Sequence, residues 1–391
     1  MNSNVFEQIQ ATLDAQGPSS AIELLCQSLR GSNDHHLLFY ALLLKKRHEL
    51  GVLPIPTAPA SSLPISSHAS YEEGIRAAAR EVGGTLLKEG QIAAAWTYFR
   101  MIEEPEPVRA ALAAYQPDEG EDIQSLIQLA LYEGLDPKKG FDLILKNYGT
   151  CSAITTLSGA ESLNDDQRQY CIKALICTLY RDLCTNIASA MAERSETSEI
   201  NPETTGTLAR LIEGRDWLFA DDTYHIDTSH LSSIVQMSMH LTHCPELDLA
   251  RELCLYGSKL SSRFLGQDDL PFEKGYSDYK TYLDIVAGHN VDEGIAYFRN
   301  KLDTTDPEEM GTYPAEVLVN LLLKLGRGKD AIEVSRKYLA RTDGRPLSCP
   351  NLNELCQRLG DYSSMAETAK DQGDPVHFLA GLLAMRDNQG R

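Results

Sequence analysis

The chain has 391 residues, of which 42 % are hydrophobic and 24 % are charged, and its formal net charge is −20. These values are typical of a globular protein that can bury a large core. The negative charge disfavours nucleic acids and anionic membranes as partners, because its field repels them, and it favours a protein or peptide partner that is basic. No stretch reaches the roughly 18 apolar residues that suggest a membrane span.

The N-terminus, MNSNVFEQIQATLDAQG, carries no basic residue and no apolar segment of the kind found in signal peptides. The nine cysteines include no C-x-x-C pair, and their odd number argues against a framework of disulfides. We therefore expect reduced thiols and a cytoplasmic protein.

Residues 1–51 form a first segment, in which the sequence predicts three helices, at about 4–16, 18–31 and 34–50. Gly51 suits the left-handed position that ends a helix. A run of basic residues, 45–48, lies at the end of the third helix. Positive charge at this end of a helix complements the helix dipole. We prefer this interpretation of the run to a nucleic-acid patch.

Residues 52–70 are rich in proline and serine, a composition that cannot build a core. This segment is either a linker or an extended arm wrapped on the protein. Helical patterns resume at 71–192 and again at 202–391. The polar residues 193–201 between these two blocks predict a hinge.

A repeat with a period of 34 residues is visible in the C-terminal block. The pairs Leu325-Gly326 and Leu359-Gly360 each close one apolar helical stretch just before another begins. This period is typical of helix-turn-helix units that bury their apolar faces against one another. A further copy lies upstream, in a set made of Ala79, Val82, Gly83, Leu86, Gly90, Ala95, Phe99, Ile102 and Pro107.

In spacing and residue class this set resembles the tetratricopeptide repeat (TPR), in which W-x-x-L-G-x-x-Y is followed by A-x-x-x-F and then P. The resemblance covers about 71–107 and 280–386. Ala79 and Leu86 replace the Trp and Tyr of the family, and Ser335 and Ala369 stand where aromatic residues are usual. The resemblance implies an all-α fold, an irregular TPR-like α-solenoid of stacked helical hairpins.

The densest group of chemically functional residues lies at 221–244. His225, Asp227 and His230 could bind zinc or iron if the chain turns between them. The structural alternative is that Asp227 or Thr228 caps a helix at about 229–242 and that the histidines only pack. We prefer this alternative, because no H-E-x-x-H or comparable motif is present.

Tyr276, Tyr279 and Tyr282 follow one another at helical spacing. Such a stripe fills the space between helices, or it lines a groove that binds a partner, since tyrosine combines an apolar body with a polar tip. We take these three residues as the candidate contacts for a partner protein.

The sequence contains no nucleotide-binding loop and no nucleophile elbow, and we expect no cofactor. The sequence therefore predicts a non-catalytic protein–protein interaction scaffold or adaptor. One alternative is a metal-dependent hydrolase or oxidoreductase centred on His225, Asp227 and His230. Another is an enzyme subunit or regulator that docks on a catalytic partner. The sequence gives no oligomeric state.

Overall fold

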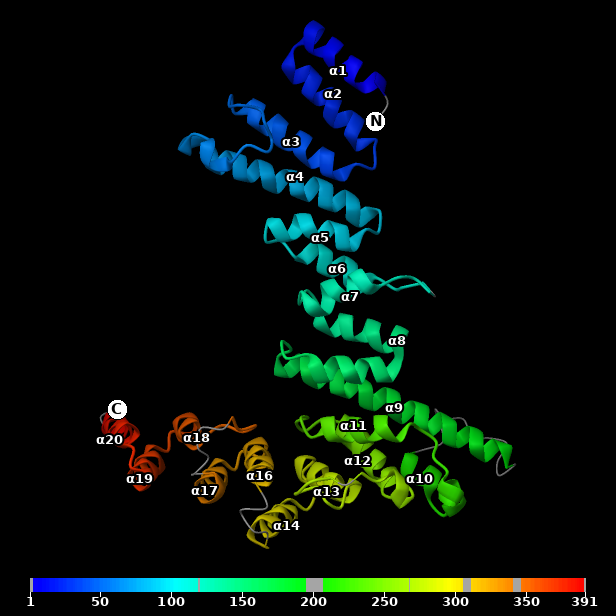
Figure 1. Ribbon diagram of the computed structural model, residues 1–391, viewed down its shortest axis with the longest axis vertical. Coiled ribbons are helices and arrows are strands. Elements are labelled where there is room, and N and C mark those ends of the chain that lie inside the picture. The colour runs from blue at the N-terminus through cyan, green and yellow to red at the C-terminus, as the bar shows by residue number, and fades with distance from the viewer. Residues whose placement is uncertain are drawn as a thin grey trace. The chain divides into compact units, whose positions relative to one another are not determined.

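The computed structural model describes residues 3–118, 120–194, 207–266, 268–304, 311–339 and 346–389. Within these ranges all regular structure is helical, and no β-strand occurs (Figure 1). This agrees with the all-α class expected from the sequence. No helix in the described ranges is both long and apolar enough to cross a lipid bilayer.

The chain divides into two compact units, Met1–Asn147 and Tyr148–Arg391. The division falls within helix α8 (Pro137–Gly159), which is interrupted at Gly149, where φ is 79°. The boundaries suggested by the sequence at 51, 70 and 193–201 do not coincide with it. Of the expected hinge, only Glu193 and Arg194 are described, and the start signal Asn201-Pro202 lies outside the described residues.

The first unit consists of helices in close succession, apart from the proline- and serine-rich segment between α3 and α4. Its helices before α8 are α1 (Ser3–Gln16), α2 (Pro18–Arg30), α3 (His35–Glu49), α4 (His68–Lys88), α5 (Ile92–Met101), α6 (Glu106–Ala114) and α7 (Gln124–Ile127), with two 3-10 turns, η1 (Ala60–Ser62) and η2 (Ile65–Ser67), and a π-helical turn, η3 (Gln128–Tyr132). From α1 to α6, each helix packs on the next one along the chain.

The three helices expected before residue 51 are confirmed, and Gly51 has the left-handed conformation expected of it, with φ of 67°. In the following pair, Ala79 and Val82 of α4 are fully buried, and so is Ala95 of α5. Val82 and Ala95 occupy positions at which the repeat pattern places an apolar and a small residue, whereas Ala79 stands where the family has Trp.

The proline- and serine-rich segment 53–70 is a wrapped arm rather than a free linker. Arg47, only 1 % exposed, donates hydrogen bonds to the carbonyl oxygens of Leu53 (3.3 Å) and Ala58 (2.6 Å) and to the hydroxyl of Tyr71 (3.1 Å). The arm thus folds back on the helices that flank it.

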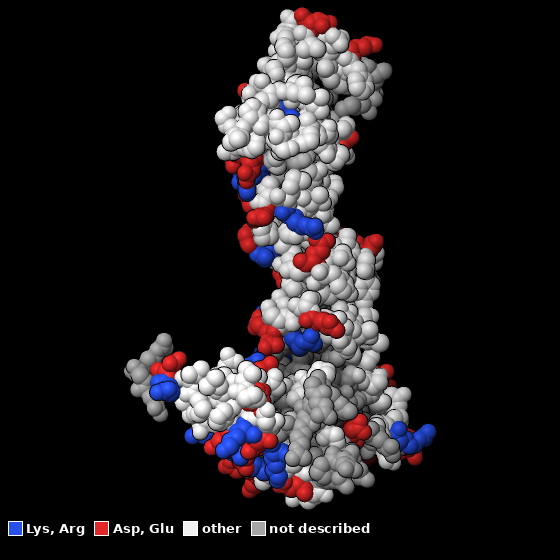
Figure 2. All heavy atoms as spheres, turned by 60° about the vertical axis from the view of Figure 1, so that its left-hand side comes forward, with Lys and Arg blue, Asp and Glu red and all other residues white. Residues whose placement is uncertain are grey.

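The basic run 45–48 does not form an open patch. Arg47 is buried beneath the arm, and Lys45 forms an ion pair of 2.6 Å with Glu23. Figure 2 shows acidic and basic side chains intermixed on the face in view. The interpretation of the run as a helix end with local partners is therefore favoured.

The second unit contains the long helix α9 and a series of shorter helices and turns. Its helices after α8 are α9 (Asp165–Glu193), α10 (Leu208–Ile212), α11 (Thr228–Ser238), α12 (Glu246–Gly257), α13 (Tyr276–Val286), α14 (Val291–Thr304), α16 (Tyr313–Lys324), α17 (Gly328–Tyr338), α18 (Leu352–Leu359), α19 (Tyr362–Gln372) and α20 (Pro375–Gln389), with 3-10 turns η4 (Asp216–Asp222) and η5 (Ser262–Phe264). Helices α9 and α11 both pack on α12, and from α16 to α20 each helix packs on the next.

The two turns that are 34 residues apart have the same backbone conformation. Gly326 (φ 70°) separates α16 from α17, and Gly360 (φ 67°) separates α18 from α19. A side chain at either position would strain the backbone, because L-residues rarely adopt positive φ. The helix boundaries predicted from these glycines are confirmed.

Candidate functional site

A hollow of about 570 Å³ lies within the second unit. We call it the inner hollow. It is lined by the first turn of α9, residues 239–242 after α11, and residues of α13, α16 and the segment 348–358. Segments far apart in the sequence therefore share one surface.

Helix α16 provides the longest wall of the inner hollow. Its sequence, YPAEVLVNLLLK, is mostly apolar, and Leu321 and Leu322 are fully buried on the core side. The residues that face the hollow recur at helical spacing and include Tyr313, Asn320 and Lys324. These three polar side chains thus lie along one stripe of a helix whose other residues, apart from Glu316, are apolar.

Lys324 ends α16 and reaches the end of α11. Its Nζ donates hydrogen bonds to the carbonyl oxygens of Met239 (2.5 Å) and Leu241 (2.9 Å). These carbonyls lie just beyond α11, where backbone acceptors lack helical donors. Burial lowers the pKa of Lys324 to about 8, although the negative charge of Asp165 opposes the shift.

His240 lies beside this lysine in the lining. Burial lowers the pKa of His240, and the charges of Lys324 and Arg168 lower it further. The imidazole is therefore neutral at pH 7, when it can both donate and accept a hydrogen bond.

Hydrogen bonds between side chains fix two walls of the inner hollow. Thr242 Oγ1 donates to Gln169 Oε1 over 3.0 Å, which ties residues 239–242 to α9. Both the backbone N and the hydroxyl of Ser348 donate to Glu316 over 2.6 Å, which ties segment 348–358 to α16. The walls are therefore held in place without a ligand.

The three tyrosines expected to contact a partner are instead core residues. Tyr276, Tyr279 and Tyr282 are 6 %, 6 % and 2 % exposed. The ring of Tyr279 stacks on Phe272 with a centroid separation of 4.3 Å. The core-filling alternative thus describes this stripe, and only Tyr282 also borders the inner hollow.

Tyr313 is the tyrosine that the inner hollow presents, with 44 % of its surface exposed. Sequence reasoning missed it. Its exposure could have been predicted from the spacing of Tyr313, Asn320 and Lys324, since polar residues along one stripe of a mostly apolar helix indicate an open face.

The residues of the metal hypothesis have separate structural roles. Asp227 caps α11, because its Oδ1 accepts hydrogen bonds from the backbone N–H groups of Ser229 (2.8 Å) and His230 (3.1 Å). The backbone N–H of His225 donates to the hydroxyl of Tyr256 over 2.8 Å. Across the described parts of the chain, no three His, Cys, Asp or Glu side chains are grouped so that they could hold a metal ion.

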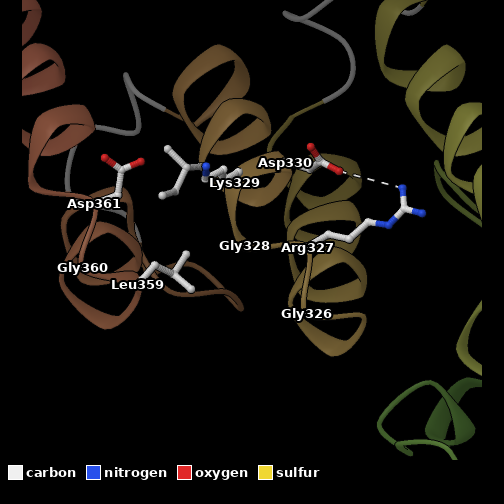
Figure 3. Close-up of a pocket in the computed structure, with 9 residues that line it drawn as sticks. Gly326, Arg327, Gly328, Lys329, Asp330, Leu359, Gly360 and Asp361 are labelled. Atoms are coloured by element: carbon white, nitrogen blue, oxygen red, sulfur yellow. Dashed lines mark ion pairs between the residues drawn. The ribbon is translucent and has the colours of Figure 1, made fainter.

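A second hollow, of about 730 Å³, separates the two repeat turns. Figure 3 shows Leu359 projecting between them and Arg327 paired with Asp330, at 3.9 Å. A β-carbon added at Gly328 would lie 2.6 Å from Leu359 Cδ2, so the turns pack closely at this point. The close contact with Leu359 explains why residue 328 is a glycine. The residues that line this hollow do not form a group suited to catalysis.

No family model matches the chain, and neither a curated protein nor a solved structure matches it. The inner hollow is therefore interpreted from its own chemistry.

Proposed function

We propose that the protein is a TPR-like α-solenoid that binds another protein at the inner hollow and catalyses no reaction itself. Two features support the solenoid: the succession of contacts from α16 to α20, and the matching conformations of Gly326 and Gly360. In such repeats, helices of successive units form an extended binding surface.

The observation that carries the binding proposal is the stripe on α16. Tyr313, Asn320 and Lys324 line the same hollow, whereas the neighbouring Leu321 and Leu322 are buried in the core. An exposed tyrosine beside hydrogen-bonding groups is typical of surfaces that bind proteins. We also propose a cytoplasmic location, since none of the nine cysteines, all of which the structure describes, forms a disulfide, and thiols persist in reducing compartments.

The test is photo-cross-linking in cells that produce the protein. A photoreactive phenylalanine analogue replaces Tyr313 in one variant and Tyr132, an exposed residue of the first unit, in the control variant. We expect discrete cross-linked proteins from position 313 that are missing from position 132. Equal patterns from both positions, or none from position 313, would contradict binding at the inner hollow.

A further inference from the structure

The inner hollow gathers positive charge in a chain whose net charge is −20. Arg168, Lys324 and Arg358 line it, together with a single carboxylate, that of Asp165. They come from α9, α16 and α18, so the folding of the second unit brings them to one surface. The charged side chains of the lining therefore have a net charge opposite in sign to that of the whole molecule. The nearby carboxylate of Glu316 is occupied by two hydrogen bonds from Ser348.

These three basic side chains form no ion pair within the described ranges of the chain. Elsewhere, basic residues of the same unit are paired, as Arg251 is with Asp284 (2.5 Å) and Lys280 with the same aspartate (2.7 Å). Asp165 influences the protonation of Lys324 through its charge but is not within ion-pair distance of it. The hollow thus holds three cations and one carboxylate, and no ion pair joins them.

The contacts that these cations do make leave their charge uncompensated. Arg168 Nη2 donates to the carbonyl oxygen of Ala160 over 2.7 Å, and Lys324 donates to two carbonyl oxygens. A carbonyl carries only a partial charge, whereas a carboxylate would neutralise a buried ammonium and form a stronger hydrogen bond. Arg358 is exposed and open to such a partner.

We propose that the inner hollow binds an acidic segment of the partner protein, with carboxylates on Arg168, Lys324 and Arg358 and apolar groups against Tyr313. This proposal rests on the proposed function. A hollow of about 570 Å³ is larger than an inorganic anion requires, and its exposed tyrosine offers contact area to a side chain. A nucleic acid fits less well, because the net charge repels a continuous polyanion.

The partner's overall charge and its contact segment need not agree. The net charge of the chain predicts a basic partner at long range, whereas the inner hollow selects acidic side chains at short range. A basic partner can therefore carry the acidic segment that enters the hollow.

The test uses three fluorescein-labelled octapeptides, in which alanine alternates with glutamate, glutamine or lysine. Their binding to the full-length protein is measured by fluorescence anisotropy. We expect the glutamate peptide to bind, the glutamine peptide to bind at least about tenfold more weakly, and the lysine peptide not to bind. Equal affinity for the glutamate and glutamine peptides, or no binding of the glutamate peptide, would overturn the proposal.

Two variants locate the binding site. Arg168→Gln and Arg358→Gln should each weaken binding of the glutamate peptide by about tenfold. Arg336→Gln is the matched control, because Arg336 pairs with Glu367 and does not line the inner hollow, and its affinity should equal that of the unaltered protein. Thermal melting monitored by circular dichroism verifies that all three variants fold. If the hollow variants bind as the control does, the proposed site is wrong.

The cross-linking experiment separates this inference from the proposed function. Cross-links at position 313 without binding of the glutamate peptide would reject the acidic segment and leave a protein-binding hollow. Absence of both results would reject both proposals.

Discussion

Phe99 packs directly on the α-carbon of Gly83. A β-carbon added at Gly83 would lie 2.7 Å from Phe99 Cε2, whereas one added at the neighbouring Gly84 would meet nothing within 4 Å. The ring therefore needs the glycine at 83, and this contact sets how closely α4 and α5 approach. It also explains why a small residue precedes an aromatic one in the repeat pattern.

The two adjacent glycines give a matched test of this packing. Gly83→Ala should lower the free energy of unfolding of the first unit by about 1–3 kcal/mol, because the added methyl group overpacks the contact. Gly84→Ala should raise it by up to about 1 kcal/mol, because alanine favours a helix and space is free. Urea unfolding is followed through Trp96 fluorescence in a Trp217→Phe background. Equal stability of the two variants would refute the contact.

A buried ion pair joins α13 to α14. Asp278 is fully buried, its Oδ2 lies 2.7 Å from Lys301 Nζ, and its Oδ1 accepts a hydrogen bond from Tyr297 over 2.6 Å. Asp278→Ala should lower the free energy of unfolding by about 3–5 kcal/mol, because it leaves a buried ammonium without its closest anion. Urea unfolding monitored by circular dichroism measures the change.

The control is the exposed pair of Lys337 with Asp303, 2.6 Å apart. Lys337→Met should cost less than about 1 kcal/mol, since water screens an exposed pair. The double variant Asp278→Ala/Lys301→Met should be less destabilised than the sum of its single changes, since each removes the other's partner. Additive losses would indicate that the two charges do not interact.

The protonation of Lys324 can be measured directly. Burial lowers its pKa to about 8, from an ordinary value of 10.5. NMR titration of a ¹³C-labelled lysine side chain, assigned by loss of its signal in Lys324→Gln, should show this low pKa. Bound glutamate peptide should raise it, because the carboxylate stabilises the ammonium. A free-protein pKa near 10.5 would show that the amine is solvated.

The lowered pKa of Lys324 also makes the free energy of unfolding depend on pH. Between pH 8 and 10.5 the unfolded chain binds more protons at this lysine than the folded chain does. The free energy of unfolding therefore rises with pH over this interval through Lys324. Comparison with Lys324→Gln by urea unfolding at both ends of the interval isolates this contribution, and a difference that falls with pH would contradict it.

Arg47 holds the arm of residues 53–70. Arg47→Met should release it, because the carbonyl oxygens of Leu53 and Ala58 lose their donor. Thermolysin, which cleaves at apolar residues, should then cut within the arm roughly tenfold faster than in the unaltered protein. Lys45→Met, which removes a pair nearby without touching the arm, should leave the rate unchanged. Equal cleavage of both variants would contradict the role of Arg47.

Local patterns predicted the helices and turns well. Gly51, Gly326 and Gly360 mark helix ends in the sequence, and the structure gives each a positive φ. The cap at Asp227 was also predicted from local sequence, since its carboxylate accepts hydrogen bonds from backbone groups only two and three residues further along the chain. Interactions of this range depend on neighbours in the chain and can be recognised without a fold.

The site was harder to predict because helical periodicity does not distinguish a core from an open groove. Tyr276 and Tyr279 have the spacing of a surface stripe, but Gly257 and Phe272 come from other segments and cover them. Similarly, the sequence around Lys324 does not predict that Arg168 lies near it, although both residues line the inner hollow. Contacts between distant segments required the structure.

The most direct measurement is hydrogen–deuterium exchange of the full-length protein, alone and with the purified protein captured by cross-linking at position 313. If the inner hollow is the binding surface, protection should concentrate in 239–242, 313–324 and 348–358, which form its walls. Unchanged exchange in these segments, with protection only elsewhere, would contradict binding at the inner hollow.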